Sequence, residues 1–177
     1  MKFGELKKHL DSCLSGDKFC AAYIVTGDDD YLVSSAIKSF KNLVAPEYAD
    51  FNLSVISGDG AVSAAVDSAY TFPVFDERKV VVLSLENALG ESDKNLLDKY
   101  LTEPSDTTVL VISCPEDVAK TIKSKKAQTV DCSKLAGEEL HSMIERLCNE
   151  PPSISIERAA VGELVDRTQG NMSRIVS

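Results

Sequence analysis

Residues 23–35 read YIVTGDDDYLVSS, and this stretch decides the fold class. The apolar run that ends at Thr26 is typical of a buried strand. Gly27 then begins a turn, and from Leu32 the apolar positions recur every three or four residues, which indicates an amphipathic helix. A strand, a glycine turn and a helix in this order are typical of the opening of a nucleotide-binding fold.

The turn itself lacks the composition of a phosphate-binding loop. A working loop reads G-x-x-x-x-G-K-[ST], so that backbone N–H groups and one lysine face the phosphates. Here Gly27 is followed by Asp28, Asp29 and Asp30. Each carboxylate within about 5 Å of a phosphate would cost roughly 3 kcal/mol at an effective dielectric constant of 20. We therefore expect a degenerate phosphate loop, no nucleotide cofactor, and acids that cap the following helix.

The rest of the first 135 residues repeats this alternation of strand and helix. Apolar runs predict further strands at 51–57, 79–85, 107–113 and 128–132, the third being central because it is the most β-branched. Amphipathic patterns predict further helices at 1–14, 60–70, 92–102 (with Ser92 as N-cap) and 115–122. Apolar strands separated by helices are typical of a parallel sheet covered on both faces, so we expect an α/β fold.

Beyond Leu135 the pattern is helical, with no further strand. It predicts two helices separated by the sequence PPS, and the start of a third helix: residues 136–150, 155–170 and 171–176. We therefore expect an AAA+ or P-loop-like α/β domain over residues 1–135 and a small helical lid domain over residues 136–177. The third helix has no cap, so we expect the lid to continue beyond Ser177.

Composition narrows the classes of function. The 177 residues carry a formal net charge of −9, which repels a phosphate backbone, so we expect DNA contact only within a complex that has more basic partners. The five cysteines form no C-x-x-C pair and are expected to be reduced thiols. Neither a secretory signal nor an apolar run of about 20 residues is present, so we expect a cytoplasmic protein with no membrane contact.

Catalytic and metal-binding groups are sparse. An ATPase needs an Asp-Glu pair after the strand at 79–85, to hold magnesium and to act on water. The sequence has Glu86 and Asn87 there. The two histidines, His9 and His141, are far apart along the chain, which gives no support to a zinc site or a nucleophile–base pair. We expect no catalytic residue and no metal site.

The stretch AYTFPVFDERK, residues 69–79, is the remaining candidate site. Phe72, Val74 and Phe75 surround Pro73 just after a predicted helix, where the chain is expected to form a surface loop. These apolar side chains either fold back into the core or stay exposed for a partner. The residues alone leave both alternatives open.

Several blocks of the chain together resemble a known family: YIVTGDDDYLVSSAIK, DFNLSVISGD, FPVFDERKVVVL, LLDKYLTEPSDTTVLVIS and ISIERAAVGELVDRTQGNMSRIV. In order and spacing they are similar to the delta subunit of the bacterial DNA polymerase III clamp loader. That family has an AAA+ domain with a degenerate phosphate loop, a helical lid and a helical collar. The resemblance covers the first two parts, and the collar is missing here.

The resemblance implies a function in DNA replication. Delta subunits grip the sliding clamp and open its ring without hydrolysing ATP, as part of a DNA-directed DNA polymerase (nucleotidyltransferase) holoenzyme. By position, the family's contact with the sliding clamp falls on Val74 and Phe75, with Phe72 and Pro73 shaping the approach. Burying a valine and a phenylalanine contributes roughly 3–6 kcal/mol. The other subunits would bind mainly through the collar. The alternative function is a divergent P-loop ATPase or phosphotransferase.

Overall fold

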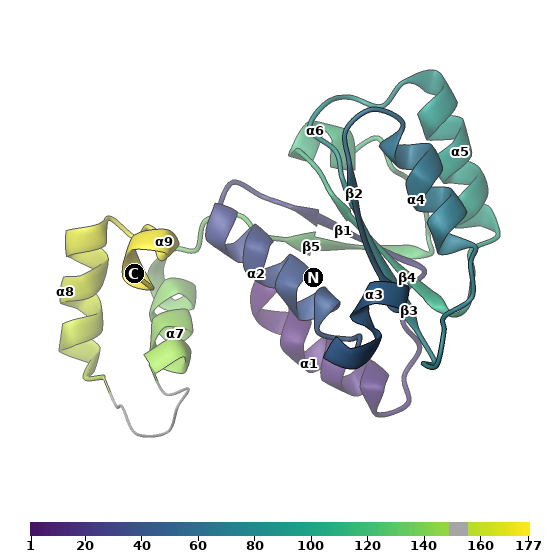
Figure 1. Ribbon diagram of the computed structural model, residues 1–177. Coiled ribbons are helices and arrows are strands. Elements are labelled where there is room, and N and C mark those ends of the chain that lie inside the picture. The colour runs from purple at the N-terminus through teal and green to yellow at the C-terminus, as the bar shows by residue number, and fades with distance from the viewer. Residues whose placement is uncertain (149–155) are drawn as a thin grey trace.

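A five-stranded parallel sheet forms the centre of the computed structural model, which describes residues 1–148 and 156–177 (Figure 1). The strands are β1 (Ala22–Thr26), β2 (Leu53–Ser57), β3 (Lys79–Ser84), β4 (Thr108–Ser113) and β5 (Ala127–Asp131), in the spatial order β2-β3-β4-β1-β5. Each pair of neighbours is parallel. The predicted α/β fold is confirmed, and the β-branched run at 107–113 is the central strand, β4.

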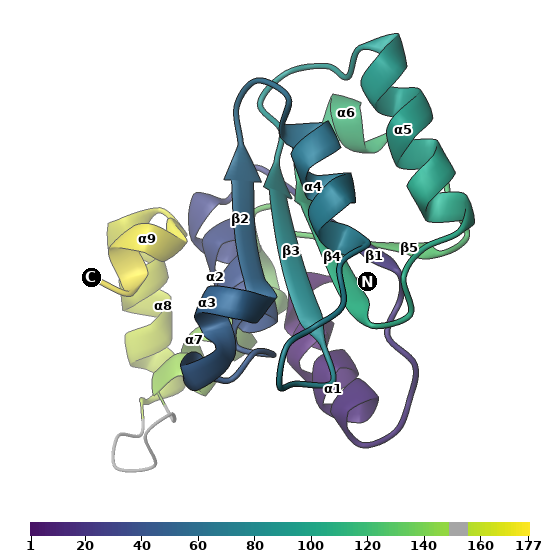
Figure 2. The ribbon, with the colours of Figure 1, turned by 45° about the vertical axis from the view of Figure 1, so that its right-hand side comes forward.

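Helices cover both faces of the sheet (Figures 1 and 2). One face packs against α1 (Phe3–Leu14) and α2 (Asp30–Lys41), and the other against α4 (Ala61–Ala69), α5 (Glu91–Thr102) and the short α6 (Glu116–Ala119). Side chains alternate between the faces of a strand. In β1, Tyr23 and Val25 therefore join the cluster of α1 and α2, while Ile24 joins the cluster of α4 and α5.

Among the described residues, three helices follow the sheet: α7 (Gly137–Cys148), α8 (Arg158–Thr168) and α9 (Met172–Ile175). Their buried side chains belong to the same hydrophobic cluster as those of α1 and α2: Leu140, Met143, Ile144, Val161 and Met172. The boundary of a separate lid domain at residue 135 stays a prediction. The PPS sequence at 151–153 lies outside the described residues. Within the described part of the chain, no helix has the length and apolar character needed to cross a bilayer.

The structure corrects three local predictions. Phe51 and Asn52, predicted as the start of a strand, end the short helix α3 (Ala49–Asn52), and β2 begins at Leu53. Ser92 is not an N-cap, because α5 begins one residue earlier at Glu91 and Gly90 holds the cap position. Leu14, the last apolar residue of the amphipathic helix predicted at 1–14, does not pack with the buried side chains of α1 and is 57% exposed.

Candidate functional site

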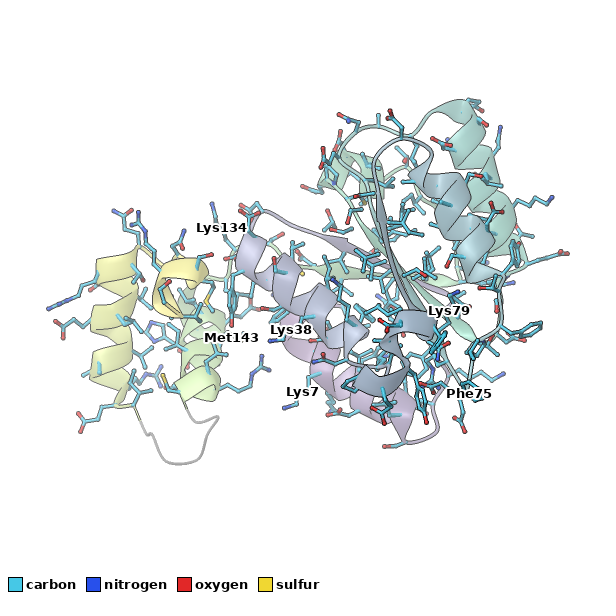
Figure 3. The ribbon with its side chains drawn as sticks, in the orientation of Figure 1. Lys7, Lys38, Phe75, Lys79, Lys134 and Met143 are labelled. Atoms are coloured by element: carbon cyan, nitrogen blue, oxygen red, sulfur yellow. The ribbon has the colours of Figure 1, made fainter. Side chains whose placement is uncertain are left out.

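The two candidate segments lie at opposite edges of the sheet. The acidic turn, residues 27–30, follows the carboxyl end of β1, and the apolar loop, residues 72–75, precedes the amino end of β3. Because the strands are parallel, these ends point in opposite directions. Figure 3 shows Lys134, which contacts the acidic turn, and Phe75 at opposite ends of the α/β part. The two segments therefore cannot form one site.

Two of the three aspartates of the acidic turn have structural partners. Asp29 is the N-cap of α2: its Oδ1 accepts a hydrogen bond from the Leu32 N–H at 3.1 Å. Asp28 Oδ1 accepts from the Lys134 N–H at 2.8 Å, and its Oδ2 lies 3.8 Å from Lys134 Nζ. Asp30 is exposed in the first turn of α2, where its charge favours the positive end of the helix. The acids thus support the backbone of the turn.

The space beside Gly27 is occupied by the chain itself. A Cβ atom built on Gly27 would lie 2.1 Å from the Cys132 carbonyl carbon and 2.5 Å from the Ser133 nitrogen. The Cys132 N–H donates to the Thr26 carbonyl at 2.7 Å, and the Asp29 N–H donates to the Cys132 carbonyl at 3.3 Å. The segment after β5 therefore lies directly against the acidic turn. Its backbone and the negative charge of the aspartates both oppose a phosphate group at this position.

The second half of an ATPase site would lie at the carboxyl ends of β2 and β3. A cavity of about 400 Å³ is present there, and Asp59, Glu86 and Asp93 are among the residues that line it. None of the described residues that line it is basic. Such a lining repels phosphate groups.

The histidines do not come together in the structure. His9 is on α1, and its Nε2 lies 2.8 Å from the hydroxyl oxygen of Tyr23 in β1. His141 is on α7. The described residues contain no cluster of three His, Cys, Asp or Glu side chains suited to a metal ion.

The apolar loop is exposed. Phe72 and Phe75 are each 81% exposed and Val74 is 39% exposed, while Pro73 is half-buried. Of the two alternatives that the sequence left open, the structure shows the one in which these side chains stay out of the core. Figure 3 shows Phe75 pointing away from the sheet near Lys79.

A hydrogen bond joins the two ends of the apolar loop at its base. Lys79, on the carboxyl side, is buried, and its Nζ donates to Oγ1 of Thr71, on the amino side, at 2.5 Å. Burial lowers the pKa of Lys79. The Arg78 guanidinium lies 4.2 Å from the centre of the Phe19 ring, a cation–π contact. The exposed phenylalanines therefore extend from a base that is tied to its neighbours.

Sequence reasoning missed Asn52, which hydrogen-bonds the Val74 backbone from α3. The signal available in the sequence was weak: a single asparagine at the start of the strand-like stretch FNLSVIS. Asparagine and aspartate often hydrogen-bond nearby backbone and favour turns over strands.

Comparisons with known proteins point to one family. The sequence model described as DNA polymerase III, delta subunit, matches residues 23–134. Over 96% of this chain, the structure resembles the Bacillus subtilis DNA clamp loader delta protein, with a TM-score of 0.73 and 24% sequence identity. It also resembles a DNA polymerase III gamma subunit-related protein from Thermotoga maritima over 84% of the chain, with a TM-score of 0.50 and 15% identity.

The match is to part of each solved structure. The chain spans 54% of the Bacillus subtilis protein and 53% of the Thermotoga maritima protein. At these identities the structural likeness is a statement about the fold. No curated protein matches the sequence significantly.

Proposed function

Because this chain belongs to the DNA polymerase III delta subunit family, we propose that it binds a sliding clamp through its apolar loop and helps to open the ring. The observation that carries this proposal is the 81% exposure of both Phe72 and Phe75 in a loop whose base is fastened to the fold. Single exposed apolar residues are common, but Phe72, Val74 and Phe75 are exposed together within four residues, and contiguous apolar patches mark interaction sites.

The energetics suit such a contact. Fully burying one phenylalanine or valine side chain contributes roughly 1.5–3 kcal/mol. Phe72 and Phe75 are largely exposed in the free protein, so each can gain most of this free energy when a partner buries it. Val74 is already partly covered and can gain less. Interfaces concentrate their binding energy in a few such anchors, often aromatic and surrounded by contacts that exclude water. By their position in the family resemblance, Val74 and Phe75 are the proposed main contacts, with Phe72 and Pro73 shaping the approach, and the exposure adds Phe72 as a further anchor.

We propose further that this subunit acts without hydrolysing ATP. The acidic turn presents three carboxylates where a phosphate loop needs backbone N–H groups and a lysine. Backbone atoms of Cys132 and Ser133 lie against Gly27. Both features oppose triphosphate binding, and they weigh against the alternative of a divergent ATPase or phosphotransferase.

The remaining partners follow from the family. The chain would join other clamp-loader subunits, mainly through a collar domain. Residues 136–177 would form part of the helical lid domain of this chain. Its net charge of −9 makes DNA contact by this chain alone unfavourable, so DNA would be met only within the assembled loader.

The test is a titration of the sliding clamp from the same organism with this chain and with a Val74→Ala, Phe75→Ala double variant. We expect the double variant to fold with an unchanged circular dichroism spectrum and to lose measurable binding. Retained affinity in the double variant would overturn the proposed contact.

A further inference from the structure

Asn52 holds the apolar loop with both atoms of its side-chain amide. Its Oδ1 accepts a hydrogen bond from the Val74 N–H at 2.7 Å, and its Nδ2 donates to the Val74 carbonyl at 2.8 Å. Asn52 has no exposed surface, so water competes little for this pair of bonds. The two residues are 22 positions apart in the sequence, and Figure 2 shows α3 beside the connection between α4 and β3.

The residue after Val74 has an unusual backbone. Phe75 has a φ of 58°, in the left-handed region that bulky side chains avoid. Among the described residues other than glycine, Gln169 alone shares a positive φ, and it ends a helix. A strained conformation persists where the surrounding structure over-determines it. The ring of Phe75 is exposed and supplies little of that restraint. The restraint therefore comes from the neighbouring backbone, where the two bonds from Asn52 hold Val74, the preceding residue.

We propose that Asn52 is a positioning residue of the apolar loop: by fixing the Val74 backbone, it keeps Phe72 and Phe75 presented before the partner arrives. This inference rests on the proposed function, since it concerns how the same loop is made ready. A loop that already has its bound shape loses less conformational freedom on binding. If only a fraction of molecules had that shape, the apparent affinity would fall by that fraction.

The test combines binding with hydrogen exchange. In Asn52→Leu both bonds to Val74 are removed while a side chain of similar size remains. We expect the dissociation constant for the sliding clamp to rise about tenfold, because ordering one backbone residue on binding weakens an equilibrium by roughly that factor. We expect the Val74 amide, which donates to Asn52 Oδ1, to exchange slowly in the wild-type chain and rapidly in the variant.

Thr108→Val is the matched control. Thr108 is 4% exposed and its Oγ1 donates to the Ala69 carbonyl at 2.8 Å. The variant therefore also removes a buried bond from a side chain to the backbone, near the end of α4. We expect it to lose stability and to keep its affinity for the sliding clamp and its slow exchange at Val74.

A coupling measurement separates positioning from general stability. If Asn52 acts through the loop, Asn52→Leu should weaken binding less in a Phe75→Ala background than in the wild-type chain, because the anchor it positions is already gone. Equal effects in both backgrounds, or a folded Asn52→Leu variant with wild-type affinity, would overturn the inference. If Asn52→Leu does not fold, rapid exchange of the Val74 amide in the wild-type chain would overturn it, and slow exchange would support it.

The proposed function fails in a different way. If Phe75→Ala binds the sliding clamp as tightly as the wild-type chain, the apolar loop is not the contact, whatever Asn52 does. If Phe75→Ala weakens binding and Asn52→Leu does not, the positioning role alone is wrong.

Discussion

Replacing Phe75 by glycine separates what this side chain contributes to binding from what its backbone costs the fold. The residue is 81% exposed, so losing the ring removes little packing from the free protein. Its φ of 58° costs a non-glycine residue roughly 1–2 kcal/mol and costs glycine almost nothing. The greater freedom of glycine in the unfolded chain offsets roughly 0.5–1 kcal/mol of that gain. We expect the free energy of unfolding to stay level or to rise by up to about 1.5 kcal/mol.

Binding should change in the opposite direction. A phenylalanine that becomes buried against a partner contributes roughly 1.5–3 kcal/mol, so Phe75→Gly should raise the dissociation constant for the sliding clamp by about 10- to 100-fold. Denaturant unfolding measures the first quantity and calorimetric titration the second. Val176→Ala, which shortens another exposed apolar side chain at the end of α9, should change neither. A loss of more than about 1 kcal/mol of stability in Phe75→Gly would show that the ring packs in the free protein, as in buried large-to-small changes. Unchanged affinity would show that the ring is not part of the contact.

Three further predictions concern the acidic turn and the core. Gly27→Ala places a methyl group on the Cys132 backbone and should lower the free energy of unfolding by roughly 1–3 kcal/mol, so an unchanged denaturation midpoint would contradict that contact. Calorimetric titration with Mg-ATP at millimolar concentration should give no heat of binding, whereas saturable heat would support the ATPase alternative. Burial raises the pKa of the Cys114 thiol to about 11 and that of Cys132 to about 12, from an ordinary value of 9.0. The unfolded chain releases these protons first, so stability should fall as the pH rises from 9 towards 12, and less steeply in Cys132→Ala.

The sheet could be predicted from the sequence because its strands are buried on both faces. Continuous apolar runs at β1, β3 and β4, separated by helical periodicity, are compatible with few arrangements other than a covered parallel sheet. The central place of β4 followed from its β-branched composition. Helix ends were harder: Ser92 has the composition of an N-cap, but α5 begins one residue before it, and sequence patterns rarely fix a boundary to one residue.

The candidate site was predictable only in part. The residues of the apolar loop could be named from their composition around Pro73, but their exposure depends on contacts across the fold. Asn52 illustrates the limit, because its role comes from a contact with Val74, 22 residues away. The alternation of apolar residues in FNLSVIS hides the short helix that places Asn52 there.

The acidic turn shows the same limit. Charge repulsion at Asp28, Asp29 and Asp30 is evident from the sequence. The position of the Cys132 backbone against Gly27 is not, because it depends on β1 and β5 pairing in parallel across about 100 residues of chain. The charge of the turn can therefore be predicted from the sequence. That a distant segment fills the space beside Gly27 becomes evident only from the folded structure.

The most direct test of the central claim is site-specific photocrosslinking from position 75. A photoreactive benzoylphenylalanine is introduced in place of Phe75 or, as a control, in place of Val176, and each chain is irradiated with the sliding clamp. We expect an efficient crosslink from position 75 into an apolar surface of the sliding clamp and none from position 176. A bound complex in which position 75 forms no crosslink would contradict it.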